Sequence, residues 1–211
     1  LRKFTANLNI MKVLNKEAQN KITPQQALEL LLEGNTRFIA NQPATKNLTE
    51  EVKQSASGQY PFATILSCID SRVSTELIFD QGIGDLFNAK VAGNAINEDV
   101  IASLEYACHF AGSKLLLVLG HTKCGAITAA CQNVEFGNIT SLLKKFESAK
   151  SKVEKMDSEE AYVDAVAKEN VVQTIAKLKN ESPALSKLNN EGNIQIVGAM
   201  YDVASGKVEL I

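Results

Sequence analysis

Short apolar runs alternate with stretches of helical periodicity along most of this chain. Four runs are nearly continuous in apolar residues and have the length of buried strands, at residues 62–67, 86–92, 114–119 and 194–201. Apolar residues recur with helical spacing between them, at residues 74–79, 98–111, 125–132, 139–155 and 158–179. Strands that alternate with helices are typical of an α/β fold, so we expect a mostly parallel central sheet of four strands flanked by helices.

Both ends of the chain add to this core. Ser205-Gly206 is typical of a turn and precedes an apolar segment at 208–211, which predicts a C-terminal edge strand. Thr23, Pro24 and Gln26 have the order of an N-cap, a first-turn proline and a capping-box partner, so we expect a helix at 24–40. We interpret residues 1–211 as a single domain, in which 1–41 form an N-terminal helical arm and 59–211 form the α/β core.

The composition fits one globular domain and narrows the range of partners. The chain has 211 residues, of which 45% are hydrophobic and 22% charged. Its net charge is −2 and its lysines and arginines form no cluster, so we expect no nucleic acid partner. The longest apolar run, residues 115–119, is far too short to cross a bilayer, so we expect no membrane partner.

The cysteine content favours a reducing compartment. Four cysteines are too few for a disulfide scaffold in a chain of this length, and free thiols suit the cytoplasm. We therefore expect a cytoplasmic protein. The chain begins at Leu1 rather than Met, so export with a removed leader stays open as the alternative.

Three soft metal ligands stand at the ends of two predicted strands. Cys68 directly follows one strand, and His121 and Cys124 follow another. The carboxyl ends of parallel strands meet at one edge of a sheet, where binding crevices form. A structural zinc site normally has four protein ligands, whereas a catalytic zinc keeps one position free for water or substrate. Two thiolates and one imidazole therefore predict a catalytic metal site.

Asp70 and Arg72 lie two and four residues after Cys68. A carboxylate beside a guanidinium is held ionised, with a lowered pKa, and accepts hydrogen bonds. Next to a metal-bound water, Asp70 would fix the direction of the O–H bond. Gly125, at the start of the predicted helix after Cys124, would offer backbone N–H groups to a small anion.

The motif Cys68-x-Asp70-x-Arg72 followed by His121-x-x-Cys124-Gly125 resembles the signature of the bacterial type of beta-class carbonic anhydrase. The resemblance runs from about Gln59 to Gly125. It implies that the two cysteines and the histidine bind one Zn²⁺ per subunit, and that Asp70 and Arg72 form the catalytic dyad.

The same resemblance implies roles for three residues outside the motif. Gln59 would hydrogen-bond substrate, and Phe87 and Tyr106 would line an apolar approach from a neighbouring subunit. Members of the family are homo-oligomers with the dimer as the basic unit, so we expect a dimer or a tetramer built from dimers. The N-terminal arm would then embrace the partner.

The function implied is the reversible hydration of carbon dioxide to bicarbonate and a proton, in which zinc-bound hydroxide oriented by the dyad attacks the substrate. Two alternatives remain open from the sequence. The same scaffold would hydrolyse a carbon dioxide analogue such as carbon disulfide if its tunnel were long and narrow. A zinc- or bicarbonate-binding protein without turnover is the other, although a purely structural site needs no ionised carboxylate beside its open position.

Overall fold

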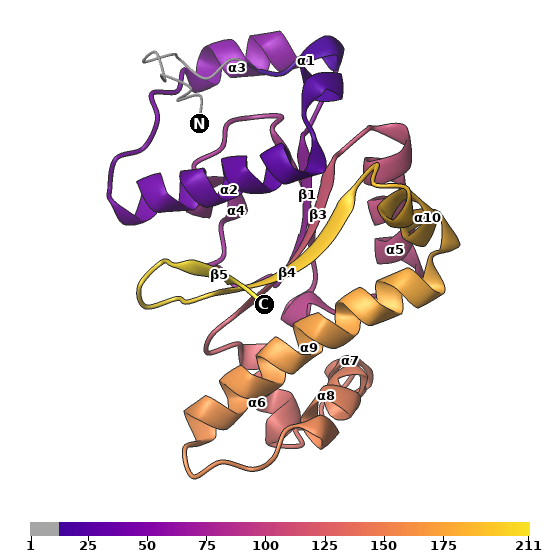
Figure 1. The fold of residues 1–211 in the computed structure, drawn as a ribbon. Coiled ribbons are helices and arrows are strands. Elements are labelled where there is room, and N and C mark those ends of the chain that lie inside the picture. Colours follow the sequence, from indigo (N-terminus) through magenta and orange to yellow (C-terminus); the bar gives the residue numbers. More distant parts are fainter. Residues whose placement is uncertain (1–12) are drawn as a thin grey trace.

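A computed structural model describes residues 13–211 of the chain (Figure 1). Its centre is a five-stranded sheet in the order β2-β1-β3-β4-β5, in which β1 to β4 are parallel and β5 runs antiparallel to β4. The strands are β1 (Ala63–Ser67), β2 (Leu86–Lys90), β3 (Leu115–His121), β4 (Gln195–Tyr201) and β5 (Val208–Leu210). The predicted α/β fold with a C-terminal edge strand is confirmed.

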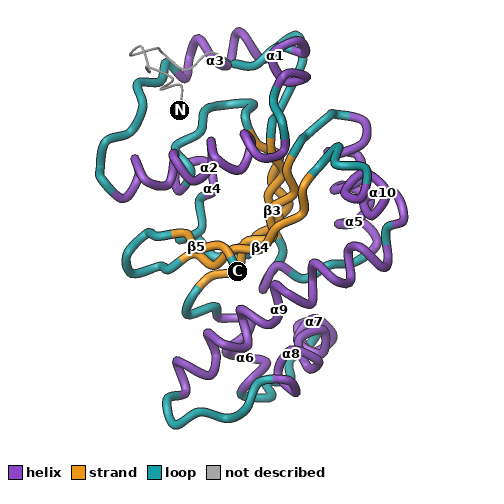
Figure 2. Tube along the Cα trace, viewed as in Figure 1, coloured by secondary structure: helices purple, strands orange, loops and turns teal. Residues whose placement is uncertain are grey.

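Helices cover both faces of this sheet (Figure 2). In chain order they are α1 (Lys16–Lys21), α2 (Pro24–Ile39), α3 (Leu48–Ser55), α4 (Thr75–Ile78), α5 (Glu98–Glu105), α6 (Gly125–Cys131), α7 (Ile139–Leu143), α8 (Glu147–Lys152), α9 (Glu159–Glu181) and α10 (Pro183–Asn190). Two 3₁₀ turns lie at Ala92–Asn94 and Lys144–Phe146, and a π-helical turn continues α5 over Tyr106–Phe110. None of the helices within residues 13–211 is both long and apolar enough to cross a membrane.

Strand β3 is buried on both faces and separates two parts of the core. Leu115, Leu117 and Leu119 pack with residues of α2 and α4, whereas Leu116 and Val118 pack with residues of α5, α9 and α10. Successive side chains of a strand point to opposite faces, so a continuous apolar run serves both layers. This explains why residues 115–119 are all apolar instead of alternating between apolar and polar.

Helix α2 begins with the predicted capping box. The Thr23 hydroxyl accepts a hydrogen bond from the Gln26 amide at 3.2 Å, and the Gln26 side chain accepts one from the Thr23 amide at 2.9 Å. Ala27 and Leu31 are fully buried against the sheet of the same chain. The helix of the predicted arm therefore packs on its own core, while residues 1–12 of that arm lie outside the described residues.

Glycines in two strands allow α9 to approach the sheet closely. A Cβ atom on Gly120 of β3 would lie 2.6 Å from Val171 Cγ2, and one on Gly198 of β4 would lie 2.8 Å from Val171 Cγ1. Real Cβ atoms do not approach other atoms so closely, so the bare backbone of both strands is needed under this part of α9. The 23-residue helix spans the sheet and continues over the segment that follows β3.

The helix predicted at 139–155 is divided in the structure. Helix α7 ends at Leu143, a 3₁₀ turn follows, and α8 begins at Glu147. The turn carries Phe146, whose ring is fully buried and occupies the space that a Cβ atom on Gly93 would need. The predicted helix is therefore interrupted at the position where this ring packs into the core.

Candidate metal centre

The three predicted metal ligands lie together at the carboxyl ends of neighbouring parallel strands. Cys68 directly follows β1, His121 is the last residue of β3, and Cys124 precedes α6. One ligand atom from each residue lies within 4.8 Å of the other two, and all three side chains are buried. The two Sγ atoms are 4.0 Å apart.

The donor atoms fit a small soft cation. Thiolates about 2.3 Å from a tetrahedral ion lie about 3.8 Å apart, close to the observed separation. His121 Nδ1 lies 2.9 Å from the Thr122 carbonyl oxygen, which can only accept, so Nδ1 carries the proton and Nε2 presents a lone pair. Nε2 is buried and has no hydrogen-bond partner among the described residues. Buried polar atoms are normally paired, so a cation bound beside Nε2 would satisfy it.

The thiols of Cys68 and Cys124 influence each other. Their mutual hydrogen bond, assisted by smaller contributions from His121 and the Gly93 amide, lowers the pKa of Cys68 to about 4. The same hydrogen bond, together with burial, raises the pKa of Cys124. The Gly93 N–H donates to Cys68 Sγ at 3.2 Å. One thiolate is thus already favoured, and a divalent cation would favour the second.

Asp70 and Arg72 form a bidentate ion pair beside this cluster. Arg72 Nε donates to Asp70 Oδ1 at 2.9 Å and Nη2 donates to Oδ2 at 2.8 Å. The hydrogen bonds from the guanidinium lower the pKa of Asp70 to about 2, so the carboxylate is ionised at neutral pH. Asp70 Oδ2 lies 4.0 Å from His121 Nε2, which places an acceptor at the edge of the ligand cluster.

The loop between His121 and Cys124 also contacts this pair. Arg72 Nη2 donates a second hydrogen bond to the Lys123 carbonyl oxygen at 3.1 Å. Lys123 has a left-handed backbone with φ of 54°, and its amide donates to Asp164 Oδ1 of α9 at 2.8 Å. Gly125 begins α6, and the position of a Cβ atom there is open space. The arrangement leaves room beside Cys124 for a small ligand.

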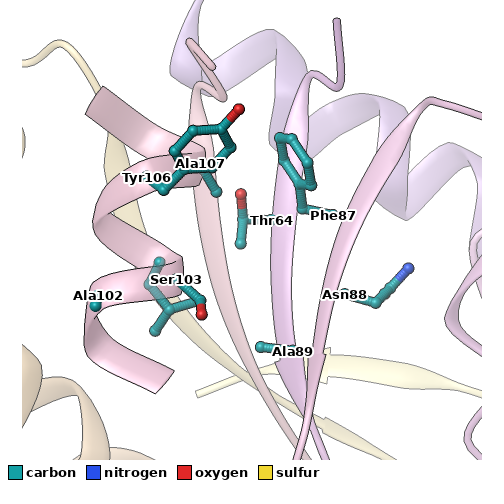
Figure 3. A pocket seen from close by; sticks show the side chains of 9 residues that line it. Thr64, Phe87, Asn88, Ala89, Ala102, Ser103, Tyr106 and Ala107 are labelled. Carbon is teal, nitrogen blue, oxygen red and sulfur yellow. The ribbon is translucent and has the colours of Figure 1, made fainter. Parts of the chain in front are cut away.

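Phe87 and Tyr106 lie together in a separate apolar cavity of about 400 Å³, between β2 and the helical segment that contains α5 (Figure 3). Their rings are 6.4 Å apart and meet edge to face. Asn88 also lines this cavity, and it lines a second hollow of about 270 Å³ that reaches Asp70. The two hollows are therefore neighbours on the surface, but no metal-ligand side chain lines the first.

Gln59 is not part of the ligand cluster within one chain. It is exposed and precedes β1, whereas Cys68 follows the same strand, so the two residues lie at opposite ends of β1. Phe87 is paired with Thr64 near the amino ends of β2 and β1. One chain thus assembles the predicted metal ligands and the Asp70–Arg72 pair, but not the three residues expected to contact substrate.

Gly93 contacts the cluster but is not among the residues expected to form the site. The strand predicted at 86–92 ends at Lys90, and the turn Ala92–Asn94 brings the Gly93 amide to Cys68. Gly93 has φ of 63° and Asn94 has φ of 46°, a backbone that favours glycine and asparagine. The pair Gly93-Asn94 directly after an apolar run was the available signal for a turn at the carboxyl edge of the sheet.

The sequence model of a protein family described as "Carbonic anhydrase" matches residues 63–208, and the curated relatives and structural neighbours agree with it. The chain belongs to the beta-class carbonic anhydrases. This class was expected from the cysteine, histidine, aspartate and arginine motif, and the expectation is confirmed. The matched region contains both halves of that motif.

Similar carbonic anhydrases come from bacteria. "Carbonic anhydrase 2" of Mycobacterium tuberculosis is 42% identical over 117 residues, which are 55% of this chain and 56% of that protein. "Carbonic anhydrase" of Mycolicibacterium smegmatis is 40% identical over 119 residues, covering 56% of this chain and 58% of that protein. The chain therefore matches little more than half the length of these curated relatives.

Solved beta-carbonic anhydrases share the fold. One of two described as tetrameric, from Sordaria macrospora, superposes with a TM-score of 0.72 at 22% identity, covering 77% of this chain and 86% of that chain. A beta-carbonic anhydrase of Aspergillus fumigatus superposes with a TM-score of 0.71 at 24% identity, covering 89% of each chain. At these identities the likeness concerns the arrangement of helices and strands.

Proposed function

We propose that this protein catalyses the reversible hydration of carbon dioxide to bicarbonate and a proton, with one Zn²⁺ per subunit held by Cys68, His121 and Cys124. The observation that carries the proposal is the buried, unpartnered Nε2 of His121 among the described residues, grouped with two thiols and 4.0 Å from a carboxylate. Bound zinc would supply a Lewis acid that lowers the pKa of a water molecule. Family membership supports the same reaction.

Asp70 acts in this proposal by orientation. Its pKa of about 2 makes it a poor proton acceptor at neutral pH, so it accepts a hydrogen bond and does not take the proton away. Arg72 fixes the carboxylate through two hydrogen bonds and is itself held by the Lys123 carbonyl. The position of a Cβ atom on Gly125 is open space, so a small anionic product would have room beside the start of α6.

A second subunit would complete the substrate approach. Among residues 13–211, strand β2 lies at the edge of the sheet and pairs with β1 alone, and an unpaired edge is normally covered. Beside it, Tyr106 is 54% exposed and Phe110 is 73% exposed, and their rings stack 6.2 Å apart. We propose that this apolar surface packs on a second copy and forms a homodimer, which a tetramer would repeat. Gln59, Phe87 and Tyr106 of one subunit would then serve the site of the other.

The free cysteines bear on the cellular compartment that we propose. All four cysteines are free in the structure, which suits a reducing compartment such as the cytoplasm. We also propose a single domain with an arm at residues 1–41 and a catalytic core at residues 59–211. Helix α2 of the arm packs on the core of its own chain.

Stopped-flow hydration of carbon dioxide with a pH indicator tests this function. The purified protein should hydrate carbon dioxide, and a chelator should abolish the activity. Cys68→Ala should lose both metal and activity, whereas Asp70→Asn should keep the metal and lose most of its turnover. An Asp70→Asn variant that runs at the parental rate would refute the role of Asp70, and hydrolysis of carbon disulfide without hydration would favour the alternative substrate.

A further inference from the structure

Helix α9 contacts two loops beside the proposed metal ligands, of which one lies between His121 and Cys124 and the other donates a backbone hydrogen bond to Cys68. Asn170 Nδ2 donates to the Gly93 carbonyl oxygen at 3.0 Å, and Asp164 Oδ1 accepts from the Lys123 amide at 2.8 Å. Gly93 lies in the loop after β2, and Lys123 lies in the loop after β3. One rigid helix therefore holds two segments that are 30 residues apart in the sequence.

The first contact acts on Cys68 through a single residue. The Gly93 amide donates to Cys68 Sγ at 3.2 Å while the Gly93 carbonyl accepts from Asn170. Asn170 is only 4% exposed, so its amide has little access to competing water. A buried donor of this kind fixes where the Gly93 backbone lies, and with it the hydrogen bond to the ligand sulfur.

The second contact acts on the loop between His121 and Cys124. Lys123 has φ of 54°, a left-handed conformation that is unfavourable for a residue with a Cβ atom. The hydrogen bond from its amide to Asp164 offsets this cost. The Lys123 carbonyl in turn accepts from Arg72, so the same backbone unit connects α9 to the pair that includes Asp70.

We propose that Asp164 and Asn170 are positioning residues of the metal centre, through which α9 holds the Gly93 amide on Cys68 and the Lys123 backbone between His121 and Cys124. The proposal rests on the metal centre described under the proposed function. Neither residue touches the metal ligands directly. Their effect is on metal affinity and on the geometry of the sulfur ligands.

Isosteric and truncated variants remove each contact separately. Asn170→Asp keeps the size of the side chain but replaces the donor to Gly93 with an acceptor. Asp164→Ala removes the acceptor, and Asp164→Asn retains an oxygen that can accept. Two matched controls lie on the same helix: Asn180→Asp at an exposed position, and Glu160→Ala, since Glu160 pairs with the side-chain ammonium of Lys123, at 3.2 Å, and not with its backbone.

The measurements are Co²⁺ affinity, by competition with a chelator, and the sulfur-to-cobalt charge-transfer absorption of the loaded protein. Asn170→Asp and Asp164→Ala should each weaken Co²⁺ binding roughly 10- to 100-fold, as loss of groups that orient metal ligands does, and should shift the absorption band. Asp164→Asn should restore the parental affinity and spectrum. Both control variants should match the parent.

A merely structural role would lower the stability of the metal-free protein but leave affinity and spectrum of the folded fraction unchanged, and that result would overturn the proposal. If Asn170→Asp does not fold, Asp164→Ala still decides, because Asp164 is only half-buried. Failure of the parent protein to bind Co²⁺ would instead overturn the metal centre itself. The two failures are therefore distinguishable.

Discussion

Replacing Gly93 with alanine should disturb both folding and metal binding. The new Cβ atom would lie 2.5 Å from Phe146 Cζ, and the backbone would keep φ of 63°. The left-handed backbone costs about 1 to 2 kcal/mol for a residue with a Cβ atom. Overpacking against the buried ring adds about 1 to 3 kcal/mol. The reduced entropy of the unfolded chain offsets less than about 1 kcal/mol, so we expect a net loss of about 1 to 5 kcal/mol.

Gly192→Ala is the matched control for the backbone contribution. Gly192 has φ of 72°, but no atom lies within 4 Å of its Cβ position, so this variant should show only the conformational cost. Urea unfolding of the metal-free protein gives both values. The difference between the two variants should be the overpacking against Phe146, about 1 to 3 kcal/mol.

A double variant tests the cause directly. Phe146→Leu removes the ring atom that a Cβ on Gly93 would meet, so Gly93→Ala should cost less in the Phe146→Leu background than in the parent. Additive losses in the double variant, or equal losses for Gly93→Ala and Gly192→Ala, would refute the packing argument. Zn²⁺ affinity should fall in Gly93→Ala, because the amide that donates to Cys68 shifts.

Three further predictions follow from the site and the core. The Asp70 pKa of about 2 lies below the value of about 3.9 for an unfolded chain. The contribution of Asp70 to the free energy of unfolding should therefore be complete above about pH 4 and lost as the pH falls through 2. A carboxyl NMR signal that titrates near pH 4, assigned to Asp70 by its loss in Asp70→Asn, would contradict this. Removing a metal present at about 100 times its dissociation constant should lower the unfolding free energy by about 2.7 kcal/mol, and an unchanged melting temperature after chelation would argue against a buried site. Gly120→Ala should destabilise the protein by about 1 to 3 kcal/mol, since its Cβ would lie 2.6 Å from Val171. In a double variant, Val171→Ala should relieve part of that loss. Purely additive losses would show that this contact is not the cause.

Local signals in the sequence predicted most of the fold. The apolar run of β3 and the capping box of α2 depend on neighbouring residues, and both appear in the structure as expected. Helices α3 and α10 were not predicted, although Asn47 and Ser182 cap them and Pro183 begins the second. These segments are short, and their apolar periodicity is correspondingly weak.

The cluster of Cys68, His121 and Cys124 could be predicted because residue type and strand position both pointed to one edge of the sheet. The contacts between α9 and the loops beside this cluster could not, since each joins distant parts of the chain. Asn170 meets Gly93 across 77 residues, and Asp164 meets Lys123 across 41. Asparagine and aspartate on a helix are common surface residues, so nothing local distinguished these two.

The bare backbone at Gly120 and Gly198 makes the separation of α9 from the sheet depend on the width of one methyl group. Because protein interiors are densely packed, a change of that width is transmitted to neighbouring groups and is not absorbed. Substitutions at Gly120, next to His121 near the end of β3, or at Gly198 in the middle of β4 should therefore change how tightly the proposed site binds its ion without replacing any of the three predicted ligands. For protein engineering, these two glycines would adjust metal release from outside the ligand set.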